Sequence, residues 1–309
     1  MSFDLIPEPQ SVTLNGDAAD SDDAGAPVPV ALPLVGRISE DRDIDDIAGV
    51  FPTQLADDIE AATGLRWDIA SDVMVAGLPA PNAATAHPVP PHASCWKSFI
   101  TLRLDPSSLE PQEYRLTIAR SGIDVVGGDT EGVRNGVQTL RQIIRQCAPA
   151  LPRLVIADKP AYKVRGYYLD ATRGRVPTLD WLKTWADRLC LYKYNQLQLY
   201  IEHTFMFDDL SETWRGTSPL KPADIIAFDE YCARLGIELV PSVSTFGHQY
   251  MAMRTRELRH LGEFPEDADR RYGFVERQRH HTLNITEPES LAFSFKLIDA
   301  YMQLFRTRK

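Results

Sequence analysis

Apolar residues in the first half of the chain follow strand-like spacing in some stretches and helix-like spacing in others. Two runs of alternating apolar and polar residues within 113–129 flank Ser121 and Gly122, which predicts a β-hairpin. A further strand is predicted at 100–104, and helices at the two stretches with helical spacing, 55–67 and 131–147. Strands followed by a covering helix indicate a small α+β domain over residues 1–158.

The second half, residues 159–309, changes to a regular alternation of strands and helices. Strands are predicted at three short apolar runs, 164–170, 195–201 and 237–243. Helices are predicted between and after them, at 178–194, 221–236 and 287–305, with Thr178 as an N-cap, Gly236 as a C-cap and a long polar loop at 244–286. This order indicates an α/β class with a parallel sheet. The pattern alone allows either a doubly wound domain or the first part of a (β/α)8 barrel.

Composition excludes some classes of protein. The 309 residues carry a net charge of −10, which argues against general binding to nucleic acid or to an anionic membrane. No apolar stretch approaches the ~18 residues of a membrane span, and the N-terminus does not resemble a signal peptide, so a cytoplasmic protein is expected. The four cysteines form no CxxC pair, and Cys190 and Cys232 are expected to be buried thiols.

Three motifs accompany the predicted strands of the second half. In chain order they are RGYYLD at 165–170 followed by Arg173, LYKYN at 191–195 with EHTF at 202–205, and RLGIELVP at 234–241 with FGH at 246–248. Together they resemble the strands that open the catalytic barrel of family 20 β-N-acetylhexosaminidases. The hairpin and helix at 113–147 are similar to the end of the small α+β domain that precedes the barrel in that family.

The resemblance implies a fold and a reaction. Residues 159–309 would be the first three βα units of a (β/α)8 TIM barrel, and the protein would remove terminal β-linked N-acetylglucosamine or N-acetylgalactosamine from a glycan. In this family the 2-acetamido carbonyl of the substrate attacks the anomeric carbon, a Glu protonates the leaving oxygen, and a preceding Asp orients the acetamido group. The resemblance implies no metal and no organic cofactor.

The catalytic Asp-Glu pair that the resemblance implies is expected beyond Lys309, because the family carries it at the end of the fourth barrel strand. We therefore expect no catalytic residue within the chain, and we expect the 309-residue polypeptide to be inactive on its own. Asp229 and Glu230 are adjacent, but they lie within the helix predicted at 221–236 and are expected to face solvent.

Two residues match family positions that serve the sugar site. Arg165 matches an arginine that binds the hydroxyls on C3 and C4 of the terminal sugar, and a planar guanidinium can hold two adjacent oxygens. The alternative for Arg165 is an ion pair with Asp158 or Asp170. His248 matches a histidine beside the catalytic acid, where it helps to set the protonation of that acid.

The second motif departs from the family. Many members end this strand with an Asp that pairs with the histidine of the third loop, whereas this chain has Glu202 and His203. Glu202 could replace that Asp as the partner of His248, and His203 could contact substrate, or both could simply cap the strand end. Trp214 in the following loop could stack on a sugar face or anchor its own loop.

Other notable residues have structural interpretations. Asp170 and Arg173 are expected to form an ion pair that holds their loop. Trp181 and Trp185 are spaced four apart on a predicted helix and are expected in the core.

Two other functions stay open. One is a different barrel glycosidase with a similar first domain, which acts on O-linked N-acetylglucosamine or on uronic acids. The other is a non-catalytic sugar-binding module, in which Arg165 is retained without the acid. An Asp-Glu pair at the end of a fourth strand would favour the hexosaminidase.

Overall fold

The computed structural model describes residues 3–14, 28–47, 49–70, 98–276 and 282–307. The chain forms two compact units, which are Met1–Lys163 with Leu191–Lys193, and Val164–Cys190 with Tyr194–Lys309. Among the helices that the structure describes, none combines the length and the apolar character that crossing a membrane requires.

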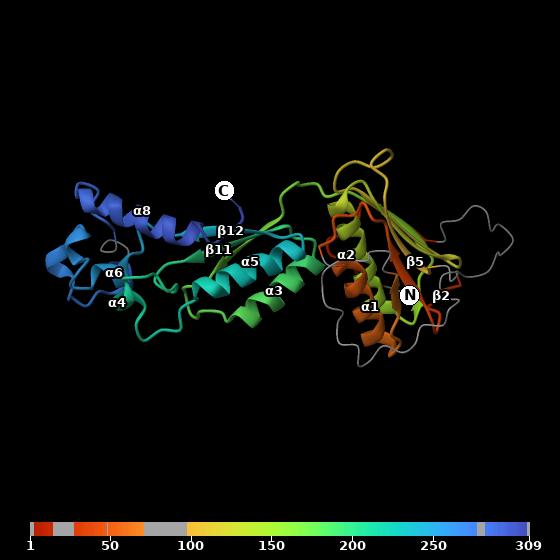
Figure 1. Cartoon of the computed structure of the whole chain (residues 1–309), viewed down its shortest axis with the longest axis horizontal. Coiled ribbons are helices and arrows are strands. Elements are labelled where there is room, and N and C mark those ends of the chain that lie inside the picture. The colour runs from red at the N-terminus through yellow and green to blue at the C-terminus, as the bar shows by residue number, and fades with distance from the viewer. Residues whose placement is uncertain (1–2, 15–27, 48, 71–97, 277–281, 308–309) are drawn as a thin grey trace. The chain divides into compact units, whose positions relative to one another are not determined.

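A seven-stranded mixed sheet is the framework of the first unit (Figure 1). Its spatial order is β1 (Ser11–Leu14), β9 (Leu154–Asp158), β6 (Tyr114–Ala119), β7 (Gly122–Gly127), β5 (Ile100–Leu104), β3 (Arg37–Glu40) and β4 (Asp68–Ala70). The antiparallel pair β6 and β7 confirms the predicted hairpin. Its turn needs a glycine, because Gly122 has a φ of 142° and a Cβ there would lie 2.8 Å from the carbonyl oxygen of Phe99.

Two helices, α1 (Val50–Thr63) and α2 (Thr130–Cys147), lie side by side along this sheet (Figure 1). Helix α2 starts at an N-cap, since the carboxylate of Asp129 accepts a hydrogen bond from the backbone N–H of Gly132 at 2.7 Å. The predicted apolar face of α2 is fully buried and consists of Val133, Val137, Leu140, Ile143 and Ile144. Helix α1 ends earlier than predicted, at Gly64, whose φ of 73° closes the last turn. A short pair of strands, β2 (Val30–Ala31) and β8 (Ala150–Leu151), completes the unit.

Three parallel strands form the sheet of the second unit. They are β10 (Gly166–Asp170), β11 (Gln196–Ile201) and β12 (Glu238–Val243), and the helices that alternate with them are α3 (Leu179–Leu191), α5 (Pro222–Arg234) and α8 (Pro288–Met302). This arrangement confirms the predicted α/β alternation and parallel sheet. Both predicted caps are present, because Thr178 Oγ1 accepts a bond from the N–H of Trp181 at 3.3 Å and Gly236 has a φ of 68°.

The stretch predicted as a long polar loop contains short helices where the structure describes it. They are α6 (Tyr250–Met253), η2 (Arg259–Leu261) and η3 (Pro265–Asp267), and the preceding loop holds α4 (Ser211–Trp214). Apolar side chains spaced too widely to form a periodic pattern are nevertheless buried here, among them Met253, Leu261 and Leu283. The prediction of a plain loop was therefore wrong in the described part.

Two predictions of burial need correction. Asp229 does not face solvent, because it is 5% exposed and its Oδ2 lies 3.2 Å from Nε of Arg306, far along the chain. Burial raises the pKa of Asp229, and the Arg306 charge opposes this rise. Trp181 and Trp185 are only half-buried, and their rings stack on each other at 5.4 Å. Cys190 and Cys232 are buried thiols, as predicted.

A pair of acidic residues in the first unit predicts a pH-dependent stability. Glu40 Oε1 and Asp46 Oδ1 are both buried without a hydrogen-bond partner among the described residues. Burial, helped by the nearby Asp46 charge, raises the pKa of Glu40 to about 8, from 4.5. The folded unit then binds a proton that the unfolded chain releases, so the free energy of unfolding falls as pH rises from about 4.5 to about 8.

Replacing Glu40 with glutamine removes this titration. The variant is expected to be more stable than the parent by roughly 1–2 kcal/mol at pH 8 and nearly equal to it at pH 4.5, because glutamine resembles the protonated acid. Thermal unfolding at the two pH values measures the difference. Glu8→Gln is the control, since Glu8 is exposed. An equal effect of Glu40→Gln at both pH values would contradict the assignment.

Candidate active site

The carboxyl ends of the three parallel strands bring charged residues together. Asp170 is the last residue of β10, Glu202 directly follows β11, and His248 follows β12 after a short turn. The register pairs Asp170 with Tyr200 and Tyr200 with Ser242, so the three strands end at the same level. The edge of a parallel sheet formed by carboxyl ends is where α/β proteins bind ligands.

Arg173 connects all three strand ends. Its Nη1 lies 2.6 Å from Oδ2 of Asp170, and its Nη2 lies 2.9 Å from Oε1 of Glu202 and 3.2 Å from Nδ1 of His248. The guanidinium carbon also lies 5.6 Å from the centre of the Tyr200 ring. One cation therefore holds two carboxylates and an imidazole from three different loops.

The charges of this cluster support one another. Burial acts to raise the pKa of Asp170, but hydrogen bonds from the Arg173 side chain and from the backbone N–H groups of Thr172 and Arg173 outweigh it and lower that pKa. The hydrogen bond to Asp170, opposed by burial, and the Glu202 charge raise the pKa of Arg173. Asp170 is thus a carboxylate and Arg173 a cation throughout the neutral range.

Glu202 is the most enclosed acid of the cluster, with a side chain that is 11% exposed. Its Oε1 accepts a hydrogen bond from the hydroxyl of Tyr200 at 2.7 Å and forms an ion pair with Nη2 of Arg173 at 2.9 Å. Its backbone N–H donates to Oγ1 of Thr172 at 3.0 Å, which ties the end of β11 to the loop after β10. Burial and the bond to Glu202 raise the pKa of Tyr200 to about 12, so Tyr200 stays a neutral donor.

His248 has a left-handed backbone conformation, with a φ of 57°, which is unusual for a residue other than glycine. The turn before it is held by two side chains, since Ser244 Oγ donates to the carbonyl of Gly247 at 2.5 Å and Gln249 Nε2 donates to the carbonyl of Ser244 at 2.7 Å. Strained residues of this kind are held by surrounding structure and concentrate at functional sites. The turn presents the imidazole at the strand ends.

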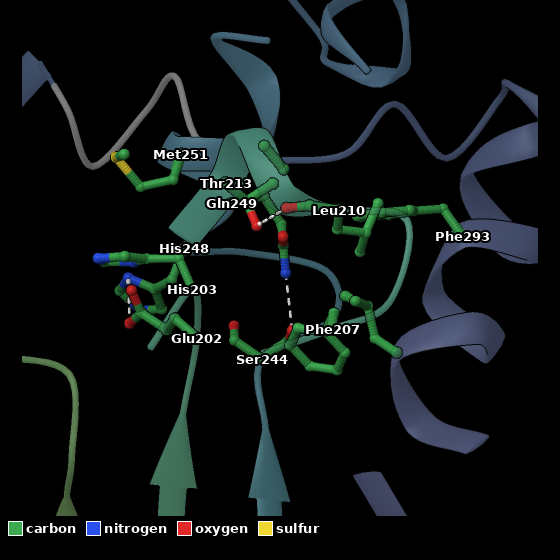
Figure 2. Close-up of a pocket in the computed structure, with 12 residues that line it drawn as sticks. Glu202, His203, Phe207, Leu210, Thr213, Ser244, His248, Gln249, Met251 and Phe293 are labelled. Carbon is green, nitrogen blue, oxygen red and sulfur yellow. Dashed lines mark hydrogen bonds and ion pairs between the residues drawn. The ribbon is translucent and has the colours of Figure 1, made fainter. Parts of the chain in front are cut away.

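A small pocket lies beside this cluster. Figure 2 shows Glu202, His203 and His248 at one side of it and Phe207 and Phe293 at the other. Burial lowers the pKa of His203, and the Glu202 charge only partly opposes this, so His203 is neutral near pH 7. Within the described ranges, no three His, Cys, Asp or Glu side chains come close enough together to hold a metal ion.

The structure groups three of the five predicted site residues. Glu202, His203 and His248 line one pocket, whereas Arg165 and Trp214 are not among its lining residues. Arg165 precedes β10 and so lies at the amino end of that strand, where its backbone N–H donates to Oδ1 of Asn195 at 2.8 Å. Trp214 Nε1 donates to the carbonyl of Phe207 at 3.0 Å, within its own loop.

Three members of the cluster, Asp170, Arg173 and Tyr200, were not predicted as part of the site. Arg173 was expected only to pair with Asp170, and that ion pair is confirmed, but its bonds to Glu202 and His248 were not foreseen. Tyr200 was read only as a strand residue. The sequence did contain an indication of its role, because a tyrosine two residues before a strand-end acid lies on the same face of the strand as that acid.

Comparison with known proteins identifies relatives of both units. A family model described as glycosyl hydrolase family 20, domain 2, matches residues 46–159. A β-hexosaminidase from Akkermansia muciniphila is 30% identical over 169 residues, which cover 46% of this chain and 33% of that protein. A lacto-N-biosidase from Bifidobacterium bifidum is 28% identical over 217 residues, which cover 68% of this chain and 18% of that protein.

Solved structures show the same fold. The exo-β-N-acetylglucosaminidase of Vibrio harveyi in complex with N-acetylglucosamine has a TM-score of 0.71 and 17% identity, over 97% of this chain and 45% of that chain. The present chain thus spans about a third or less of the two curated relatives and under half of this solved structure. The matching domain model and the curated relatives show that the chain is similar to proteins of glycosyl hydrolase family 20, and the solved structure shows a shared fold.

Proposed function

We propose that this chain is part of an exo-acting β-N-acetylhexosaminidase that removes terminal β-linked N-acetylglucosamine or N-acetylgalactosamine. The observation that carries the proposal is the cluster of Asp170, Arg173, Glu202 and His248 at the carboxyl ends of three parallel strands, in a chain whose relatives include β-hexosaminidases. We further propose that residues 159–309 are the first three βα units of a (β/α)8 barrel that follows an α+β domain of residues 1–158. The strand order β10-β11-β12 and the helix after each strand support this.

The proposed reaction is substrate-assisted and retaining. The acetamido carbonyl oxygen bonds to the anomeric carbon as the glycosidic bond breaks and an acid protonates the leaving oxygen; water then opens the cyclic intermediate. The cluster would support the sugar-binding edge, with Glu202 and Asp170 fixing Arg173 and His248 facing the pocket. Arg165 lies at the amino end of β10 and does not line the pocket, so the family resemblance alone supports the proposal that it binds the C3 and C4 hydroxyls.

The reaction predicts a strict need for the 2-acetamido group. The product of the whole reading frame is expected to release p-nitrophenol from the β-N-acetylglucosaminide at least about 1,000-fold faster than from the β-glucoside, because only the first substrate carries the nucleophile. A continuous absorbance assay measures both rates. Comparable rates on the two glycosides would favour a different barrel glycosidase, and binding of N-acetylglucosamine without hydrolysis would favour a sugar-binding module.

We also propose that the polypeptide of residues 1–309 lacks this activity by itself. None of its three described parallel strands ends in an Asp-Glu pair, and the adjacent Asp229 and Glu230 lie within α5. Losing the acid costs on the order of 100-fold or more in rate. Turnover well above the uncatalysed rate by this polypeptide would contradict the proposal.

A further inference from the structure

The nearest side-chain partner of the His248 ring is a cation. Nη2 of Arg173 lies 3.2 Å from Nδ1 of His248, whereas Oε1 of Glu202 lies 4.0 Å from the same nitrogen. The first distance is within the range of a hydrogen bond and the second is beyond it. Arg173 is therefore the hydrogen-bond partner of Nδ1, and Glu202 lies beyond hydrogen-bond distance of the histidine.

The chemistry of the two groups decides the direction of this hydrogen bond. A guanidinium carries five N–H donors and no acceptor, so Nδ1 of His248 must offer its lone pair. A neutral imidazole has one proton, which is then on Nε2. We propose that Arg173 is a positioning residue that holds His248 as the Nε2–H tautomer, so that His248 presents a hydrogen-bond donor to the pocket.

The surroundings fix the guanidinium in this orientation. Asp170 at 2.6 Å and Glu202 at 2.9 Å bind two of its nitrogens, and both acids belong to the same cluster. The turn that carries His248 is fixed as well, by the side-chain bonds of Ser244 and Gln249. The guanidinium cannot turn away without losing its contacts with both acids, and the fixed turn keeps His248 beside it, so the preference for one tautomer persists.

The consequence for chemistry rests on the proposed function. A carboxylate partner would accept a hydrogen bond from Nδ1–H and leave Nε2 as an acceptor, whereas the cation reverses this order. His248 then donates Nε2–H to an oxygen in the pocket, which belongs either to the catalytic acid beside which the family places this histidine or to the bound N-acetylhexosamine. In this arrangement the role of Glu202 at the end of β11 is to form the ion pair that fixes the Arg173 guanidinium.

Nuclear magnetic resonance of ¹⁵N-histidine-labelled protein at mildly alkaline pH tests the tautomer without any enzyme assay. The signal of His248, assigned with His248→Asn, is expected to show Nδ1 unprotonated and Nε2 protonated, with a preference of about 10- to 100-fold from a charge-assisted bond. His260 on the surface, whose Nε2 lies 2.9 Å from Glu289, is the internal control. A His248 signal with the proton on Nδ1 would overturn the proposal.

Two variants separate positioning from folding. Arg173→Met removes the donor and is expected to shift the proton of His248 toward Nδ1, so that Nδ1–H donates a hydrogen bond to Glu202, while the His260 signal stays unchanged. Arg173→Lys keeps a cationic donor and is expected to keep the proton on Nε2. An unchanged tautomer in a folded Arg173→Met protein would also overturn the proposal. Because these signals do not depend on hydrolysis, they stand even if the proposed activity fails.

Discussion

Replacing Glu202 with glutamine is expected to lower kcat/KM for p-nitrophenyl β-N-acetylglucosaminide by about 100-fold, or about 2.7 kcal/mol, in the product of the whole reading frame. Glutamine keeps the size of the side chain but removes the charge that balances Arg173. Oε1 of Glu202 lies 2.9 Å from Arg173 and 2.7 Å from the Tyr200 hydroxyl, at a site that is 11% exposed. Without the Glu202 charge, Asp170 is the remaining carboxylate of the cluster on the half-exposed guanidinium, which shifts toward Asp170 and away from His248.

The control for this variant is Glu212→Gln. Glu212 lies in α4, in the loop after the same strand, and is exposed, so its replacement is expected to change kcat/KM less than about twofold. Thermal unfolding of both variants separates a loss of activity from a loss of fold. Equal activity of the two variants would remove the Arg173 cluster from the proposed site.

The positions of the site residues could be predicted, but their partners could not. The strands that end at Asp170 and before Glu202 were recognisable from apolar runs, because strand periodicity is a local property. Which side chains meet depends on the register of β10, β11 and β12, and the neighbouring strand lies 30 or more residues away. The sequence therefore indicated the Asp170–Arg173 pair, three residues apart, and did not indicate the bonds from Arg173 to Glu202 and His248.

In the first unit, too, single elements could be predicted from their own residues, whereas the pairing of distant strands could not. The strand at 100–104 and the helix at 131–147 were predicted from their own residues and are confirmed as β5 and α2. The pairing of β1 with β9 joins Ser11 to Ala157, a contact that no local pattern reports. β1 itself is exposed along its whole length, so it lacks the alternation that marks a half-buried strand.

A buried lysine in the first unit carries the largest expected effect on stability. Replacing Lys193 with methionine is expected to destabilise the fold by about 3–5 kcal/mol, because it leaves the carboxylate of Asp158 buried without its cation. The Lys193 side chain is 2% exposed, and its Nζ lies 3.5 Å from Oδ2 of Asp158 and donates to the Tyr114 hydroxyl at 3.1 Å. That hydroxyl in turn shares a hydrogen bond with Thr139 at 2.7 Å. Burial and the Asp158 charge raise the pKa of Tyr114, so it stays neutral.

Thermal unfolding followed by circular dichroism measures this effect, which for a unit of this size corresponds to a fall in Tm of roughly 10 °C. Lys159→Met is the matched control, since Lys159 is half-exposed and pairs with the exposed Glu110, and its loss is expected to cost less than about 1 kcal/mol. Adding Asp158→Asn to Lys193→Met removes the buried charge and is expected to recover part of the loss. No recovery in the double variant would show that Lys193 stabilises the unit through packing of its side chain, and that the ion pair with Asp158 contributes little.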